Sequence, residues 1–94
     1  MAMSFEQRLI VSPDVLVRVI GEEAVLLNLE TELYLGLDPV GTRMWTVLQE
    51  APSISHGFDR LLAEFDVESE VLRRDVEEFI GELLAQSLIE LKPA

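Results

Sequence analysis

A chain of 94 residues has the length of one domain, and its 49% hydrophobic content is enough to build a buried core. The chain has no cysteine, so it has no disulfide and no thiolate ligand for a metal. Eighteen acidic residues against seven basic ones give a formal net charge of −11, which repels nucleic acids and anionic lipid surfaces. The composition therefore excludes a wholly disordered chain and argues against nucleic acid and membrane as partners.

The N-terminal residues 1–10 are expected to form a tail, and residues 11–94 a single domain. Glu6 precedes Arg8, the only base of the tail, and the tail lacks an apolar run long enough for a secretory signal. Nowhere does the chain reach the roughly 18 consecutive apolar residues of a membrane-spanning helix. Together with the absence of cysteine, these features predict a cytoplasmic protein.

Three short runs of β-branched and aliphatic residues predict strands at residues 15–20, 24–29 and 33–37. The connections, residues 21–23 and 30–32, are too short for the crossover that parallel strands require. The three strands are therefore expected to form an antiparallel meander, and a sheet this small leaves at least one edge unpaired.

Helix signals begin after the third strand. Asp38 can accept hydrogen bonds from the first free backbone N–H groups, so a first helix is predicted from there to about Glu50. Ser53 caps a second helix, which runs to about Phe65. Gly57 lies inside this second helix, where glycine costs about 1 kcal/mol relative to alanine, so its helical pattern is weaker than the first.

A third helix is predicted after residues 66–69, which supply its cap, because apolar residues then recur at the helical period. The apolar stripe contains Leu72, Val76, Phe79, Ile80, Leu83 and Leu84. It covers about 140° of the helix, so either the domain's own core buries all of it or part of it faces a partner. The apolar residues within 88–91 then predict a short terminal strand or an extended tail. Strands followed by helices define an α+β fold, with the helices on one side of an antiparallel sheet.

The chain has few residues that could carry out catalysis. His56 is the only histidine, and its place in the second helix is typical of a solvated or locally hydrogen-bonded side chain. Asp75, Glu78 and Glu82 share one helix face, but no oxygen-rich loop accompanies them, so they are interpreted as a solvated acidic face and not as a calcium or magnesium site. We therefore expect no catalytic residue, no metal, no cofactor and no enzymatic activity.

Four stretches of the sequence carry a resemblance to a known family. They are VSPDVLVR (residues 11–18), VLLNLETELYLGLDPVGTRMW (25–45), FDV (65–67) and DVEEFI (75–80). Over residues 11–91 this ordered series closely resembles the PqqD-like family. Its members are small peptide chaperones, also called precursor-peptide recognition elements, which serve the synthesis of ribosomally made, post-translationally modified peptides. The resemblance implies a winged-helix-like α+β fold of three antiparallel strands and three helices.

Two positions depart from the family pattern. The family usually has glycine where this chain has Glu32, after the threonine of the second turn, and where it has Ser87, near the end of the third helix. A left-handed backbone at either position would be more costly for these residues than for glycine.

The resemblance implies a non-enzymatic chaperone that binds the leader segment of a precursor peptide. It would present the leader to a modifying enzyme, such as a leader peptidase, a cyclase or a radical enzyme. The leader would add as a strand beside the third strand and pack against the third helix, a mode known as β-augmentation. The expected peptide-binding residues are Leu33, Tyr34, Leu35, Leu72, Arg73, Val76, Glu77 and Ile80. The leucines of the strand would form a groove with the apolar helix residues, and Arg73 and Glu77 would select charge at its rim, with Arg73 favouring an acidic leader.

Two other functions compete with this hypothesis. An assembly domain could form a homodimer through the same sheet edge or apolar stripe. A winged-helix DNA-binding protein has a compatible order of elements, but its recognition helix is expected to carry bases. Residues 64–82 hold many acids against only Arg73 and Arg74, so the charge argues against DNA.

Overall fold

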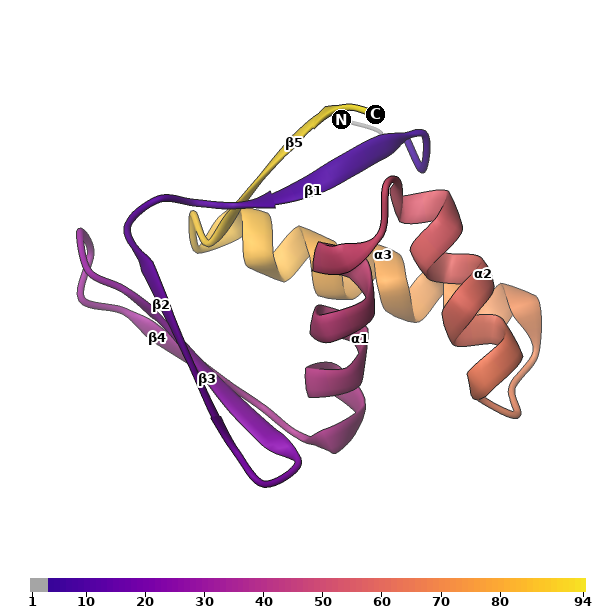
Figure 1. Cartoon of the computed structure of the whole chain (residues 1–94), viewed down its shortest axis with the longest axis horizontal. Coiled ribbons are helices and arrows are strands. Elements are labelled where there is room, and N and C mark those ends of the chain that lie inside the picture. The colour runs from indigo at the N-terminus through magenta and orange to yellow at the C-terminus, as the bar shows by residue number, and fades with distance from the viewer. Residues whose placement is uncertain (1–3) are drawn as a thin grey trace.

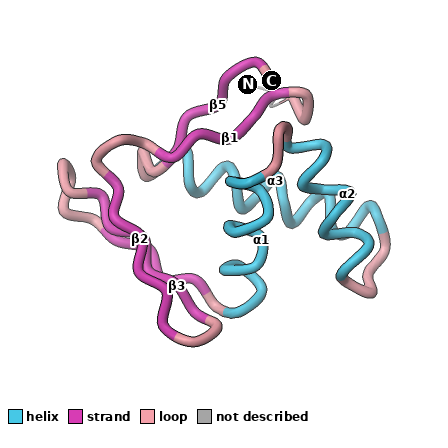
Figure 2. The backbone as a smooth tube through the Cα atoms, viewed as in Figure 1, coloured by secondary structure: helices cyan, strands magenta, loops and turns pink. Residues whose placement is uncertain are grey.

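The computed structural model describes residues 4–94 (Figure 1). In chain order the elements are β1 Gln7–Val11, β2 Val15–Ile20, β3 Glu23–Asn28, β4 Tyr34–Leu37, α1 Pro39–Glu50, α2 Ile54–Glu64, α3 Ser69–Ala85 and β5 Ile89–Pro93. The antiparallel meander followed by three helices is therefore confirmed, and so is the α+β class. Figure 2 shows the three helices gathered together, with strands along two sides of them.

The larger sheet has the strand order β2-β3-β4, and both pairs are antiparallel. Leu26 on the central strand lies opposite Val17 on one side and Leu35 on the other. Gly21 opens the β2–β3 turn with a φ of +64°, a conformation that glycine adopts without strain. Among residues 4–94 no further strand extends this sheet, so β2 and β4 are its two edges.

A second sheet pairs β1 with β5, so residues 7–10, which were expected to belong to a tail, form a strand; residues 1–3 of that expected tail lie outside the described residues. Leu9 lies opposite Leu91, and its side chain is buried in the core. The pairing continues past the strands, because the N–H of Ser12 donates to the carbonyl of Leu88. Residues 7–11 could not be predicted as a strand from local pattern alone, since their only strand partner lies at the other end of the chain. Of the two options for residues 88–91, the terminal strand is confirmed.

Two of the predicted helix caps are present. The Asp38 carboxylate accepts a hydrogen bond of 2.7 Å from the N–H of Gly41, and the Ser53 hydroxyl accepts from the N–H of His56 at 3.1 Å. The third helix begins differently, because its cap residue is Glu68 and makes no side-chain capping bond. The start of α3 therefore depends on tertiary packing more than on a cap.

The core lies between the helices and the inner faces of the two sheets. Its largest fully buried side chains are Leu26, Leu48, Ile54, Leu61, Leu72, Ile80, Leu83, Leu88, Val47 and Val76. Helix α1 contacts α2, β1, β3 and β4, so it connects both sheets to the helical layer. The start of α1, directly after β4, therefore has a position fixed by most of the fold.

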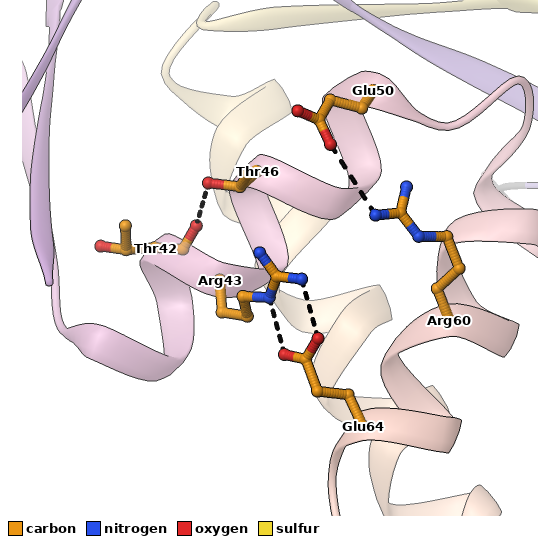
Figure 3. Close-up of polar contacts among 6 residues, drawn as sticks. All are labelled: Thr42, Arg43, Thr46, Glu50, Arg60 and Glu64. Atoms are coloured by element: carbon orange, nitrogen blue, oxygen red, sulfur yellow. Dashed lines mark hydrogen bonds and ion pairs between the residues drawn. The ribbon is translucent and has the colours of Figure 1, made fainter.

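Two ion pairs join α1 to α2 on the surface (Figure 3). The Arg43 guanidinium donates from Nε and Nη2 to the two Glu64 carboxylate oxygens, at 2.7 and 2.8 Å. Further along the same pair of helices, Arg60 lies 3.8 Å from Glu50. The hydrogen bonds from Arg43 lower the pKa of Glu64 below its ordinary value.

Candidate functional site

The histidine and the carboxylates do not gather into a metal-binding cluster in the part of the chain that the structure describes. His56 holds its Nδ1 atom 2.7 Å from the Ser53 hydroxyl, which confirms a locally hydrogen-bonded helix histidine. Among residues 4–94, no three His, Cys, Asp or Glu side chains are placed together so that they could hold a metal ion. No described helix is both long enough and apolar enough to cross a membrane.

The open feature of the molecule is the outer edge of β4. The N–H of Asn28 donates to the carbonyl of Leu33 at 2.9 Å, so these two residues form a hydrogen-bonded pair of the β3–β4 ladder. In an antiparallel ladder such pairs alternate with non-bonded ones, so Leu35 and Leu37 also direct their backbone groups toward β3. The N–H and C=O groups of Tyr34 and Gly36 therefore point away from the sheet and are free to pair with an added strand.

A groove lies beside the end of β4, between the first turns of α1 and one flank of α3. It is lined by Asp38, Val40, Gly41, Met44, Asp75, Glu78, Phe79 and Glu82. Val40 is exposed and Phe79 half-buried, so apolar surface is open to solvent there. In the view of Figure 1 α3 crosses behind α1, and residues of both helices line the groove.

Near the other end of β4, Asn28 at the end of β3 is hydrogen-bonded to the C-terminal end of α3. Its side-chain oxygen accepts from the N–H groups of Glu30 and Thr31, at 2.9 and 3.2 Å, and so shapes the β3–β4 turn. Its side-chain nitrogen donates to the carbonyls of Gln86 and Ser87 at the end of α3, at 3.4 and 3.2 Å. Because Asn28 lies next to Leu27, the partner of Tyr34, the free edge of β4 begins close to the C-terminal end of α3.

The predicted apolar wall of the site is buried in the core instead. Leu72, Val76 and Ile80 are at most 1% exposed, so a peptide could not reach them without opening the core. The structure therefore favours the alternative in which the domain's own core buries this part of the stripe. On α3 the apolar side chain that lines the groove is Phe79, which lies at the margin of the predicted stripe.

The predicted charged rim, Arg73 and Glu77, lies on the flank of α3 that faces away from the groove. At 100° per residue, Arg73 is about 160° around the helix from Asp75. The guanidinium of Arg73 lies 4.2 Å from the centre of the Phe5 ring and pairs with Glu77 at 3.7 Å. Arg73 therefore interacts with Phe5 in the N-terminal part of the chain and with Glu77 on its own helix.

The predicted strand residues Leu33, Tyr34 and Leu35 lie at the free edge or next to it. Leu33 and Tyr34 are exposed, Tyr34 to 71%, whereas Leu35 is half-buried on the inner face of the sheet. Sequence analysis did not select the groove residues Val40, Met44 and Phe79. Phe79 belongs to the predicted apolar stripe of the third helix, but which margin of that stripe stays open depends on how α1 and α3 lie in the fold.

An exposed strand edge that continues into a groove is the geometry of a domain that docks an extended chain. The chain belongs to the PqqD family, since the family model described as Coenzyme PQQ synthesis protein D (PqqD) matches residues 23–89. This finding confirms the resemblance seen in the sequence. No curated protein sequence matches the chain.

Two solved structures are similar to this fold. The first, titled "TbiB1 in Complex with the TbiA(beta) Leader Peptide", has 36% sequence identity and a TM-score of 0.80, and the match covers 86% of this chain and 94% of that one. The second, "Lasso peptide synthetase B1 complexed with the leader peptide", has 19% identity and a TM-score of 0.78, with 88% and 98% covered. The second match shows the shared fold.

Proposed function

We propose that this protein is a non-enzymatic peptide chaperone. It binds the leader segment of a ribosomally made precursor peptide by strand addition at β4 and presents it to a modifying enzyme. The observation that carries the proposal is the free edge of β4, where Tyr34 and Gly36 direct unpaired backbone groups outward beside the groove. Membership of the PqqD family and the 36% identity to TbiB1, a protein solved with a leader peptide, support it.

The chemistry of binding follows from the geometry of an added strand. Backbone hydrogen bonds to Tyr34 and Gly36 supply affinity for any extended peptide with the right register. Side chains of the peptide alternate between the two faces of the sheet, so every second one faces the helices. Those side chains can contact Val40 and Phe79, and this contact supplies selectivity for apolar residues.

The charge distribution weighs against the DNA-binding alternative. Duplex DNA is bound by several bases on one face, whereas the groove flank of α3 carries Asp75, Glu78 and Glu82. On the same helix, Arg73 is occupied by Phe5 and Glu77. We therefore expect no gel shift with duplex DNA at physiological salt.

The test of strand addition is a pair of substitutions at Gly36. Gly36→Pro removes the outward N–H without disturbing the ladder to β3, and edge strands tolerate proline. The matched control is Gly36→Ala, which keeps the N–H and adds a Cβ with no atom within 4 Å. Short peptides selected from a random display library on the wild-type protein serve as the probe.

We expect Gly36→Pro to weaken the selected peptides at least about tenfold, while Gly36→Ala binds them as the wild type does. Circular dichroism confirms that both variants are folded. If no peptide is selected, or if every selected peptide binds the proline variant with unchanged affinity, strand addition at β4 is wrong.

A further inference from the structure

We infer that the groove beside β4 selects a basic peptide: the segment that pairs with β4 carries lysine or arginine on the side that faces α3. This inference rests on the proposed function, because it concerns the occupant of the same site. It reverses the sign expected from Arg73, which lies on the other flank of the helix.

The wall of the groove that α3 supplies has three acidic side chains and one apolar side chain. Glu78, Glu82, Asp75 and Phe79 fall within an arc of about 100° of the helix, and all four line the groove. The three carboxylates are exposed, and none of them forms an ion pair within the described residues, where the pairs are Arg43–Glu64, Arg60–Glu50 and Arg73–Glu77. Their negative charge is therefore available to a partner.

The opposite wall adds to this charge and does not neutralise it. Asp38 lines the groove at the start of α1, and its carboxylate is held in place by the capping bond to Gly41. The basic residues of the chain are Arg8, Arg18, Arg43, Arg60, Arg73, Arg74 and Lys92. None of these lines the groove, and Arg74, one turn before Glu78 on α3, makes no ion pair with it. Among the residues that line the groove, an acidic peptide would meet only like charge.

The spacing of the carboxylates matches that of an extended peptide. Glu78 and Glu82 are four residues apart on a helix, about 6 Å along its axis. Alternate side chains of a strand are about 6.8 Å apart, so residues i and i+2 of a peptide can each face one of the two glutamates. Phe79 lies about 60° around the helix from Glu82, and together with Val40, which also lines the groove, it can hold an apolar side chain next to a basic one.

The experiment compares selected peptides on the wild type and on two variants with the same total charge. The groove variant is Asp75→Asn, Glu78→Gln, Glu82→Gln. The control variant removes three exposed carboxylates that do not line the groove, by Glu6→Gln, Asp59→Asn and Glu68→Gln, which lie before β1, on α2 and just before α3. A display library of short random peptides is selected on the wild type and counter-selected on the Gly36→Pro variant, so that only binders at the β4 edge remain.

We expect the remaining peptides to be enriched in lysine and arginine at alternate positions, and to lose about tenfold or more in affinity on the groove variant only. Replacing their bases by glutamine should cause a similar loss on the wild type. If binders at the β4 edge are recovered without this enrichment, charge selection is wrong and strand addition stands. An equal loss on the groove and control variants would assign the preference to net charge and overturn the inference. If no binder depends on Gly36, both proposals fail.

Discussion

Glu32 and Ser87 hold backbone conformations that favour glycine, with φ of +64° and +55°. These are the two positions where sequence analysis found a departure from the family pattern, so the departures fall on positions that carry backbone strain. Ser87 completes the end of α3, where its N–H donates to the Leu84 carbonyl and the N–H of Leu88 donates to the Leu83 carbonyl. This pair of hydrogen bonds defines a Schellman motif, which normally has glycine at the position of Ser87.

We expect Glu32→Gly and Ser87→Gly each to raise the free energy of unfolding by about 0.5–1 kcal/mol. A left-handed backbone conformation costs about 1–2 kcal/mol for a residue with a Cβ atom, and glycine removes this cost. The greater freedom of glycine in the unfolded chain offsets part of the resulting stabilisation. Urea denaturation measures the change. The controls Glu32→Ala and Ser87→Ala keep the Cβ atom and should give no such gain, so a gain in the alanine variants would attribute the effect to something other than backbone strain.

At the scale of elements, Gly57 determines how closely α2 approaches α1. A Cβ atom at this position would lie 2.8 Å from Leu48 Cδ2 and 3.4 Å from Ala51 Cβ, and Leu48 is fully buried. In the sequence this glycine looked like a weakness of the second helix. The structure shows that α2 is helical through it and that the missing side chain is what allows the two helices to pack.

We expect Gly57→Ala to lower the free energy of unfolding by about 1–2 kcal/mol, because the cost of overpacking exceeds the gain in helix propensity. Gly81→Ala is the matched control, since Gly81 lies inside α3 and a Cβ there would meet no atom within 4 Å. That variant should gain up to about 1 kcal/mol. Chemical denaturation of both variants tests the assignment, and a stabilised Gly57→Ala protein would contradict it.

The Arg43–Glu64 pair links α1 and α2 in a pH-dependent way. Because Arg43 lowers the pKa of Glu64 in the folded state, the pair contributes stability above the ordinary glutamate pKa of 4.5, and this contribution is lost as the pH falls through the lowered value. We expect the stability difference between wild type and Arg43→Gln to be largest near neutral pH and to shrink below about pH 4.5. The pKa of Glu64, followed by NMR titration, should rise in the variant. A difference that does not vary with pH would show that the pair does not act through Glu64 ionisation.

At the scale of the whole molecule, the two ends of the chain form one sheet. Leu9 on β1 is 3% exposed and belongs to the core, so the segment expected to be a tail stabilises the fold. We expect Leu9→Ala to cost about 2–4 kcal/mol in the free energy of unfolding. Arg8→Ala, on the exposed side of the same strand, should cost little. Thermal unfolding of the two variants compares them, and equal melting temperatures would mean that β1 contributes no core packing.

Local patterns were enough to predict the meander, the three helices and two of their caps. They failed where the outcome depends on residues distant in sequence. The strand at residues 7–11 needs β5 at the other end of the chain, and the apolar stripe of α3 could not show which margin stays open. Leu72, Val76 and Ile80 have the same periodicity as Phe79, but only Phe79 lies where α1 leaves a groove.

The position of the β1–β5 sheet determines where a linker to another protein would lie relative to the groove. The groove lies at the start of α1, whereas the carbonyl of Phe5 accepts a hydrogen bond from the N–H of Ser55 beyond the end of that helix, and Figure 1 shows β1 and β5 on that side of the molecule. The helix itself is about 18 Å long. A linker attached at either end would therefore leave the groove open. Fusion to an enzyme through a short flexible linker would hold a bound peptide at a millimolar effective concentration near that enzyme, without any contact surface between the two.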